Sequence, residues 1–282
     1  MRIALIDTFY EDSHRIWAEG VERCLGVKVD IYSGSAFNWK WKMTGGTIPL
    51  AEALNESNQN YDRLIMTDMV NIPLFKSLLI ERYQSIPIII YFHENQITYP
   101  WSPTDMDVVK NRDHHYGFIN FSSALIANKI CFNSEYHKRS FLGELPRFLK
   151  MFPDDRFKDY HKPLLEKSYV LPIGLDLPAY KASKEDLPVF LWNHRWEYDK
   201  NPDLFFEVLF KLKEKDVPFK VIVLGKSYKK SPLIFAMAKK RLESEILHFG
   251  YAESREAYME LMTKANVLMI TSHQDFFWHQ YS

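Results

Sequence analysis

The chain has 282 residues, of which 46% are apolar and 15% aromatic, and its 36 basic side chains balance its 36 acidic ones. The apolar content excludes a disordered chain, and the zero net charge excludes a protein whose whole surface attracts nucleic acid. Two cysteines exclude a disulfide scaffold, and with no signal peptide and no apolar run of roughly 20 residues we expect a cytoplasmic protein.

Short apolar runs alternate with amphipathic stretches along the chain. The predicted strands are 2–6, 28–32, 62–67, 87–92, 129–132 and 168–171, then 189–192, 219–224, 246–248 and 266–270. The predicted helices are 13–24, 73–83, 116–127, 135–148, 202–215, 232–243 and 254–263. This alternation indicates βαβ units and mainly parallel sheets, so the predicted fold class is α/β.

The stretch 172–187 separates the two series of elements. It contains prolines, a glycine and charged residues, and it lacks a hydrophobic period, which is typical of a linker. We therefore predict an amino-terminal domain at 1–174, a linker at 175–187 and a second domain at 188–282.

Charged and histidine side chains follow several predicted strands, among them His93, Glu94, His194, Arg195 and His273. In open α/β sheets, ligands bind outside the carboxyl ends of the strands. Ordinary turn chemistry explains the glycines and asparagines at such ends better than it explains these residues. The pattern therefore predicts a ligand site at the carboxyl edge of each sheet, with the two edges facing one cleft.

The run 192–202 joins the first strand of the second half to its first helix. Arg195 follows the strand, Lys200 precedes the helix, and either Asp199 or Asn201 can cap that helix. Two cations beside a helix N-terminus suit a diphosphate. The alternative is a surface loop in which neighbouring carboxylates neutralise both cations.

The run 90–100 ends a strand in a cluster of polar side chains. Such a cluster is costly to bury without partners, so we expect it to face a cleft, where His93 and Glu94 could move a proton or bind sugar hydroxyl groups. A solvated loop is the alternative. The remaining histidines lack the spacing of a closed ligand set, so a metal site is disfavoured.

Two further segments of the amino-terminal half carry ligand hypotheses. The strand–loop–helix element at 7–14 can present backbone N–H groups, although Ser13 could equally cap the helix, and no glycine-rich fingerprint supports a dinucleotide cofactor. Trp39 and Trp41 alternate with lysines, which fits either stacking and phosphate contact with a nucleic acid or a half-buried edge strand. Basic residues that form either a phosphate-facing patch or a solvated helix face are Lys138, Arg139, Arg147, Lys150, Arg156, Lys158 and Lys162.

A set of segments points to one family. They are Ser13-His14, the segment at 39–41, 91–96, Tyr116-Gly117, 132–134, 194–197 with Asp199-Lys200, Leu224-Gly225, 248–251 and 272–277. Together they resemble the tRNA-queuosine α-mannosyltransferase family of glycosyltransferase-like proteins, from residue 2 to about 277. The resemblance implies a GT-B fold of two Rossmann-like domains and transfer of mannose from GDP-mannose with retained anomeric configuration. It also implies the cyclopentene-diol of queuosine in aspartate tRNA as acceptor, and no metal ion or cofactor.

The resemblance also assigns roles to residues by position. Arg195 and Lys200 would bind the donor diphosphate, and Gly225 and Tyr251 would lie at the nucleotide. Cations at the diphosphate stabilise the charge that develops on the leaving group. These four residues therefore form the expected donor site of the second domain.

Two further residues are assigned to catalysis. His93 matches the site histidine of the amino-terminal domain, and Asp275 stands where the superfamily has the first Glu of a Glu–seven residues–Glu pair, which would hold donor-sugar hydroxyl groups. The residues assigned to the acceptor side are Ser13, His14, Trp39, Trp41, Glu94 and Asn95.

The sequence departs from the family pattern at its end. At 278–282 it lacks the glycine and the apolar helix that carry the second Glu, which would fall one residue beyond Ser282. We therefore expect an incomplete second domain and weak transfer activity. Alternatives to the tRNA mannosyltransferase are a GT-B enzyme with another donor or a small acceptor, and a non-catalytic module that binds nucleotide or RNA.

Overall fold

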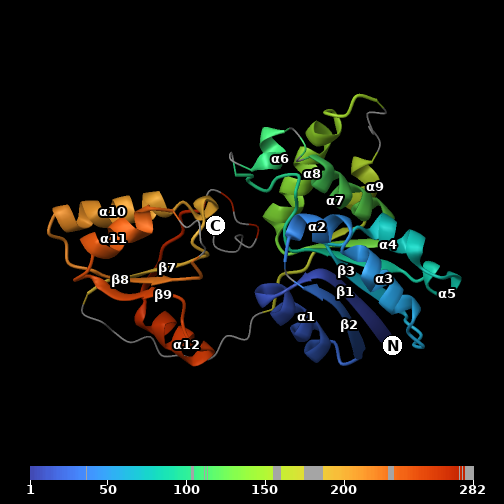
Figure 1. The fold of residues 1–282 in the computed structure, drawn as a ribbon, viewed down its shortest axis with the longest axis horizontal. Coiled ribbons are helices and arrows are strands. Elements are labelled where there is room, and N and C mark those ends of the chain that lie inside the picture. The colour runs from blue at the N-terminus through green and yellow to red at the C-terminus, as the bar shows by residue number, and fades with distance from the viewer. Residues whose placement is uncertain are drawn as a thin grey trace. The chain divides into compact units, whose positions relative to one another are not determined.

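The computed structural model describes residues 1–35, 37–102, 105–110, 112, 114–154, 160–174, 187–227, 232–272, 274 and 276, with the side chain of Asp12 left aside. The chain divides into two compact units, Met1–Leu175 together with Phe276–Ser282, and Asp176–Asp275. Each unit is built around its own parallel sheet (Figure 1). Apart from Leu187, the predicted linker lies outside the described residues, as does the predicted departure at 278–282.

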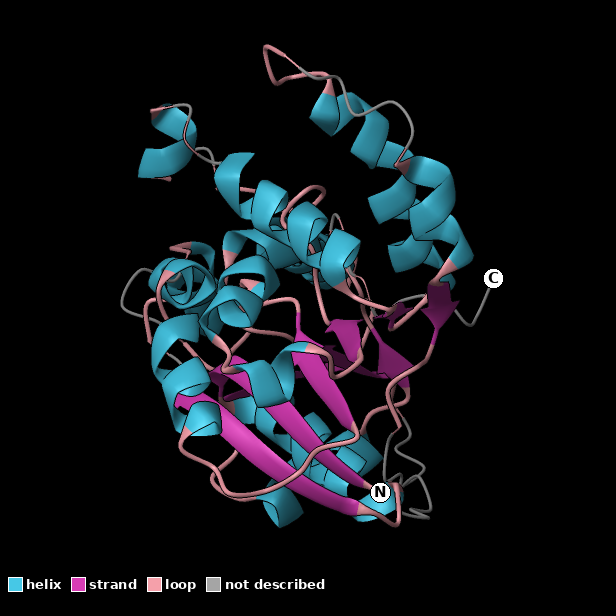
Figure 2. Ribbon diagram, turned by 90° about the vertical axis from the view of Figure 1, so that its right-hand side faces the viewer, coloured by secondary structure: helices cyan, strands magenta, loops and turns pink. Residues whose placement is uncertain are grey.

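The sheet of the first unit has six parallel strands in the order β2-β1-β3-β4-β5-β6. The strands are β1 (Arg2–Tyr10), β2 (Lys28–Ser35), β3 (Arg63–Thr67), β4 (Ile88–Phe92), β5 (Lys129–Phe132) and β6 (Ser168–Val170). The helices are α1 (Asp12–Cys24), α2 (Trp39–Thr44), α3 (Thr47–Asn55), α4 (Ile72–Leu78), α5 (Glu81–Gln84), α6 (Met106–Val109), α7 (His114–Ile126), α8 (Glu135–Leu149) and α9 (His161–Glu166). Sheet and helices are seen from the side in Figure 2.

Helices cover both faces of this sheet, because successive side chains of a strand point to opposite faces. In β1, Ala4 and Ile6 belong to the larger hydrophobic cluster, which includes Phe75 of α4. Leu5, between them, belongs to a smaller cluster that includes Ala18 of α1. A strand buried on both faces reads as a continuous apolar run, which is why β1 was predictable.

The sheet of the second unit has four parallel strands in the order β10-β7-β8-β9. The elements are β7 (Val189–Asn193), the 3-10 helix η1 (Tyr198–Lys200), α10 (Pro202–Glu214), β8 (Lys220–Leu224), α11 (Ile234–Arg241), β9 (Ile246–Gly250), α12 (Arg255–Lys264) and β10 (Val267–Leu268). Aromatic side chains fill the main cluster, where the ring of Trp192 stacks on Phe205 at 5.8 Å between centroids. The α/β prediction with parallel sheets is confirmed.

Each predicted strand is present. β1, β2 and β9 extend two or more residues beyond the prediction, and β10 has two residues where 266–270 was predicted. The predicted helix at 73–83 is two helices. The backbone is extended at Leu79 and Ile80, between α4 and α5. Asn55 holds this break, because its side chain donates to Leu78 O at 2.8 Å and accepts from Ile80 N at 3.0 Å. Within the described part of the chain, none of the helices combines the length and apolar character needed to cross a bilayer.

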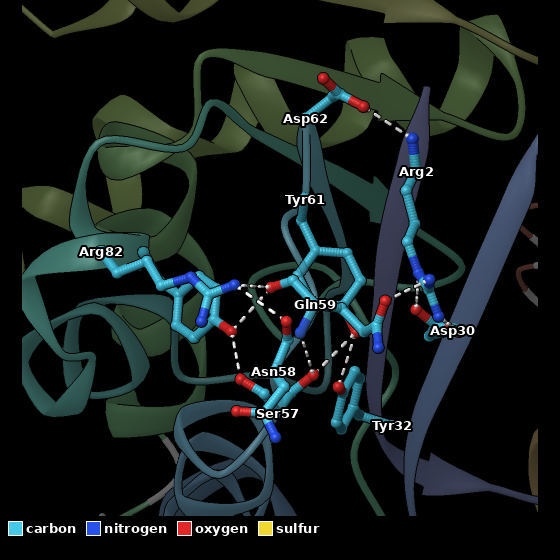
Figure 3. A network of polar contacts seen from close by, with 10 residues as sticks. Arg2, Asp30, Tyr32, Ser57, Asn58, Gln59, Tyr61, Asp62 and Arg82 are labelled. Carbon is cyan, nitrogen blue, oxygen red and sulfur yellow. Dashed lines mark hydrogen bonds and ion pairs between the residues drawn. The ribbon is translucent and has the colours of Figure 1, made fainter.

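A polar network fixes the loop that leads into β3 (Figure 3). Arg2 donates to both carboxylate oxygens of Asp30, at 2.5 and 2.9 Å, and to Gln59. Arg82 donates to Gln59 O at 2.8 Å. The hydroxyl of buried Tyr83 donates to Ser57 O at 2.7 Å and reaches Gln59 O at 2.9 Å. The loop is therefore tied to β1, β2 and α5.

Replacing Tyr83 with Phe removes this hydroxyl and leaves the Ser57 carbonyl without its donor. We expect Tyr83→Phe to lower the free energy of unfolding of the first unit by about 1 kcal/mol, or its Tm by about 2–4 °C. Thermal unfolding followed by circular dichroism measures the change. Tyr169→Phe, at a side chain that is about half exposed, is the matched control. Equal Tm values for the two variants would contradict the assigned role.

Candidate functional site

Four side chains meet in the first unit at the carboxyl ends of β1, β3 and β4. Asp7 lies in β1, Asp68 directly follows β3, His93 directly follows β4, and His14 lies in the first turn of α1. Asp7, Asp68 and His93 are buried, with at most 3% of each exposed. The rings of His14 and His93 stack, with centroids 4.1 Å apart and planes inclined by 27°. These residues form what we call the Asp–His cluster.

Both carboxylate oxygens of Asp7 make hydrogen-bond contacts within the protein. Its Oδ1 accepts from Phe9 N and from Thr67 Oγ1, both at 3.0 Å, and its Oδ2 lies 2.8 Å from His14 Nδ1. Burial disfavours a charge on His14, but the hydrogen bond and the negative charge of Asp7 outweigh it and raise the pKa of His14 to about 9. Asp7 and His14 therefore form an ion pair at neutral pH.

The backbone of His93 is held on both sides. Its N–H donates to Asp68 Oδ1 at 2.8 Å, and its carbonyl oxygen accepts from Asn133 Nδ2 at 2.8 Å. The ring lies edge-on to Trp17 of α1, with centroids 4.6 Å apart. Burial, followed by the charge of His14, lowers the pKa of His93 well below its usual value, so this ring is neutral. Burial also raises the pKa of Asp68 to about 7.

The Asp–His cluster holds polar atoms that lack a hydrogen-bond partner within the described residues. They are both ring nitrogens of His93 and Oδ2 of Asp68, although His93 Nδ1 lies 3.5 Å from Asp68 Oδ1. A buried polar atom without a partner costs free energy, and such atoms commonly meet water or a ligand. These atoms mark the first unit's candidate binding point.

The polar loop after β4 is buried, so the expectation that all of it faces a cleft is wrong in part. Asn95 is fully buried, and its Oδ1 accepts from Ile97 N at 3.1 Å and from Thr98 N at 3.0 Å. Asn95 therefore shapes the turn. Glu94 is partly exposed and accepts from Gln96 Nε2 at 2.9 Å.

The two residues predicted at the start of α1 behave differently. Ser13 is exposed and does not cap the helix, because the cap position is Glu11, which makes no side-chain capping bond. His14 points into the Asp–His cluster. Of this pair, the structure brings His14 to His93 and leaves Ser13 at the surface.

Trp39 and Trp41 lie in the short helix α2, so the edge-strand interpretation is wrong. Trp39 packs on Trp101, with ring centroids 5.6 Å apart. Lys40 lies between Asp105 Oδ1 at 2.5 Å and Asp107 Oδ2 at 2.7 Å, which neutralise its charge. Trp41 is 63% exposed. Trp41 therefore remains a surface ring that a base could stack on, while Lys40 is engaged within the protein.

The predicted basic patch is largely a set of locally paired side chains on α8. Arg139 pairs with Glu135 at 3.0 Å, Arg147 lies 3.7 Å from Glu144, and Lys138 donates to the carbonyl oxygen of Ser168 at 3.0 Å. Arg156 and Lys158 lie outside the described residues. The solvated-face alternative describes α8 better than a phosphate-facing patch.

In the second unit, the connection from β7 to α10 carries both predicted diphosphate cations. Arg195 is 49% exposed at its side chain and pairs with Glu197 at 3.2 Å. Lys200 lies 3.3 Å from Asp199 and is mostly buried. The helix cap is Asn201, whose side chain accepts from Leu204 N at 3.4 Å. Both cations therefore have carboxylate neighbours, as the surface-loop alternative required, and both lie before the N-terminus of α10.

Gly225 fixes the path of this connection. Its φ is +138°, and an added Cβ would lie 1.8 Å from the carbonyl oxygen of His194. Trp196, which follows Arg195, stacks flat on Phe235 at 4.2 Å. The backbone N–H of Trp196 donates to Lys226 O at 3.1 Å. The loop that carries Arg195 is thus pressed against the end of β8, where only glycine fits.

The remaining predicted site residues are at the surface or not described. Tyr251, after β9, is 68% exposed, as a side chain that stacks on a ligand base could be. Asp275 lies outside the described residues. Over the ranges that the structure describes, His, Cys, Asp and Glu side chains form no group of three that could hold a metal ion.

Sequence reasoning gave no role to Asp7 or Asp68, although each closes an apolar strand run. Their position at the ends of predicted strands could have indicated a role, because parallel strands bring their carboxyl ends to one edge of the sheet.

Both halves of the chain match known family models. Residues 2–175 match the model described as tRNA-queuosine alpha-mannosyltransferase N-terminal, and residues 176–277 match glycosyl transferases group 1. The chain is also 31% identical to the tRNA-queuosine alpha-mannosyltransferase of Drosophila melanogaster, over 98% of this chain and 74% of that protein. The chain belongs to the tRNA-queuosine alpha-mannosyltransferase family.

Solved structures confirm the fold class of this family member. HepE from Anabaena in complex with UDP matches with a TM-score of 0.63 and 15% identity, over 97% of this chain and 75% of that one. The catalytic domain of starch synthase IV from Arabidopsis thaliana, bound to ADP and acarbose, matches with a TM-score of 0.64 and 10% identity, over 97% and 78%. The predicted GT-B fold is therefore confirmed.

The close approach at Gly225 gives a testable consequence. Gly225→Ala combines an unfavourable φ with a backbone clash, so we expect it to destabilise the second unit by about 2–4 kcal/mol. Hydrogen–deuterium exchange should show lost protection in β7 and β8, with β1 to β4 unchanged.

Gly20→Ala is the matched control for that experiment. Gly20 lies inside α1 with no atom within 4 Å of an added Cβ, so alanine should stabilise α1 by up to about 1 kcal/mol. Unchanged protection of β7 and β8 in Gly225→Ala would show that the close approach does not constrain the loop.

Proposed function

We propose that the chain is a retaining glycosyltransferase that moves mannose from GDP-mannose to queuosine in the anticodon of aspartate tRNA, in the cytoplasm. The family assignment over both halves of the chain is the observation that carries the proposal. The proposed chemistry needs no metal ion and no cofactor besides the nucleotide-sugar.

The proposed donor site uses the connection from β7 to α10. Arg195 and Lys200 bind the diphosphate, exchanging their present carboxylate neighbours for phosphate oxygens. Positive charge fixed in place stabilises the departing diphosphate most in the transition state, where its negative charge develops. Tyr251 stacks on the base, and Asp275 holds sugar hydroxyl groups.

The proposed role of His93 is to bind the transferring sugar through its ring. A neutral imidazole can donate one hydrogen bond and accept another, which suits a hydroxyl group. The transition state of glycosyl transfer resembles an oxocarbenium ion, so a neutral ring also avoids repulsion with the developing positive charge. The partnerless ring nitrogens of His93 support this role.

The acceptor role is proposed for the surface of the first unit around Trp41 and for Glu94, which follows His93 of the Asp–His cluster. An exposed indole ring can stack on a nucleobase. Because the paired side chains of α8 leave few cations for phosphates, we expect recognition by stacking and by the queuosine itself to matter more than a basic surface.

A direct assay tests the function. The chain is incubated with GDP-[14C]mannose and with aspartate tRNA that contains either queuosine or unmodified guanosine. We expect label only in the queuosine tRNA. UDP-glucose, ADP-glucose and UDP-galactose serve as alternative donors, and free queuosine serves as a small acceptor. Label from another donor, or in free queuosine alone, would replace the proposed substrate, and GDP binding without transfer would favour a binding module.

The donor site gives a quantitative prediction. Arg195→Ala and Lys200→Ala should each weaken GDP binding by about 1.5–3 kcal/mol, or about 10- to 150-fold in Kd, because each removes a charge-assisted hydrogen bond. Titration calorimetry measures the affinity.

Lys211→Ala is the matched control, since Lys211 is an exposed lysine on the neighbouring helix α10. Its Kd should equal that of the unchanged chain. If Arg195→Ala and Lys200→Ala behave like the control, neither residue contacts the diphosphate.

A further inference from the structure

The Asp–His cluster contains two imidazole rings in contact, with a carboxylate beside each of them. His14 Nδ1 lies 2.8 Å from Asp7 Oδ2, and His93 Nδ1 lies 3.5 Å from Asp68 Oδ1. The two ring centroids are 4.1 Å apart. Four ionisable side chains thus meet at one point. Sugar binding by His93 alone does not explain why His14 and Asp7 lie there.

We propose that Asp7 and His14 are positioning residues, an ion pair that orients the ring of His93 and keeps it neutral for sugar binding. This inference rests on the proposed function of His93 but concerns residues that act through it. His14 supplies a flat surface against which the His93 ring is stacked, and the Asp7 carboxylate fixes that surface in place.

The geometry locates the positive charge on His14. Asp7 is fully buried and its Oδ1 already accepts two hydrogen bonds, so its remaining oxygen, Oδ2, is the one that faces the imidazole. A buried carboxylate needs a cationic or hydrogen-bonding partner, and His14 is placed to supply the cation. Two stacked imidazolium ions at this separation would repel strongly, so His93 stays neutral while His14 is charged.

The other ionisable groups around His93 come from four elements. They are Asp68 after β3, Tyr91 in β4, Glu94 in the following loop, and His137 in α8. Burial, together with His93, lowers the pKa of His137 to about 3, so His137 is neutral as well. Because burial raises the pKa of Asp68 to about 7, Asp7 is the carboxylate that would favour a protonated His93 if the charge on His14 were removed.

The direction of the pH effect follows from this arrangement. In the unchanged chain, His93 is neutral throughout the range above pH 6. Removal of the positive charge of His14 should raise the pKa of His93, because that charge opposes protonation of His93 and the Asp7 carboxylate favours it, while burial continues to lower the pKa. A larger fraction of His93 would then be protonated at pH 6 than in the unchanged chain, and donor turnover should fall as the pH is lowered.

Three variants of the full chain test the proposal. His14→Phe keeps an aromatic ring for stacking but removes the charge, Asp7→Asn removes the partner that holds the charge, and His161→Phe is a control at an exposed histidine of α9. Histidine titrations are followed by NMR of 13Cε1-labelled histidine between pH 5 and 10. Circular dichroism checks that each variant is folded.

In the unchanged chain, we expect the His14 resonance to titrate near pH 9 and that of His93 to stay constant above pH 5. In Asp7→Asn, the titration of His14 should move below pH 6.5. The His93 resonance should titrate in both His14→Phe and Asp7→Asn, with the larger shift in His14→Phe because Asp7 keeps its charge there.

The kinetic measurement is kcat/KM for mannose transfer at pH 8 and at pH 6. Relative to the unchanged chain and to His161→Phe, we expect an extra fall at pH 6 in His14→Phe, since a larger fraction of His93 is protonated there. If the His93 resonance stays constant over the pH titration in both folded variants, the Asp7–His14 pair has only a structural role and the proposal is overturned.

A His14 titration near 6.5 in the unchanged chain would overturn it without any variant. The NMR titrations need no substrate, so they answer the question even if the chain transfers another sugar or none. A failed transfer assay with the expected titrations would contradict the proposed function and leave the ion pair in place.

Discussion

Parallel strand order is the constraint from which both candidate binding points follow. A parallel sheet requires a crossover between successive strands, so all carboxyl ends lie along one edge and every loop at that edge leads into the next covering element. In the first unit this brings residues 7, 68 and 93 together, although they lie in or directly after three different strands. In the second unit it brings the end of β7, with Arg195, against the end of β8, with Gly225.

The Asp7–His14 and Arg195–Glu197 pairs differ in exposure, whereas Lys200 and Asp199 form a second, mostly buried pair. The Asp–His cluster is closed, and its ions are matched within the protein. Arg195 and Glu197 instead meet near the surface, where water and salt screen the pair and its net contribution to stability is small. A weak pair can be exchanged for phosphate oxygens at little cost, whereas separating Asp7 from His14 would leave a buried charge without a partner. The Asp7–His14 pair therefore suits a fixed ring, and the Arg195–Glu197 pair suits a ligand that enters and leaves.

How much the sequence could predict depended on how local the cause was. The strands were predictable because burial on both faces demands continuous apolar runs, as in β1 and β4. The break between α4 and α5 was not, because it is held by Asn55, more than twenty residues away in the sequence. The same applies to Lys40, whose charge is neutralised by Asp105 and Asp107, 65 and 67 residues further along the chain.

Candidate residues were predictable from their place at strand ends, but their states were not. His93 and His14 could both be predicted as site residues from the sequence. No sequence pattern, however, indicates that their rings stack or that one ring is charged and the other neutral. The charge on His14 arises from Asp7, which reaches His14 only once β1 and α1 have packed, and the neutral state of His93 arises first from burial.

The difference between the two histidines has a consequence for how the site tolerates change. His93 is restrained through its backbone by Asp68 and Asn133 and through its ring by His14 and Trp17. Because its main-chain bonds do not depend on the side chain, substitution of His93 should leave the loop after β4 in place. Substitution of Asp7 or His14, by contrast, alters the net charge of the Asp–His cluster. The pKa values of the other ionisable groups in the cluster must then change. The two residues that act through His93 are thus the ones on which the electrostatics of the Asp–His cluster depend.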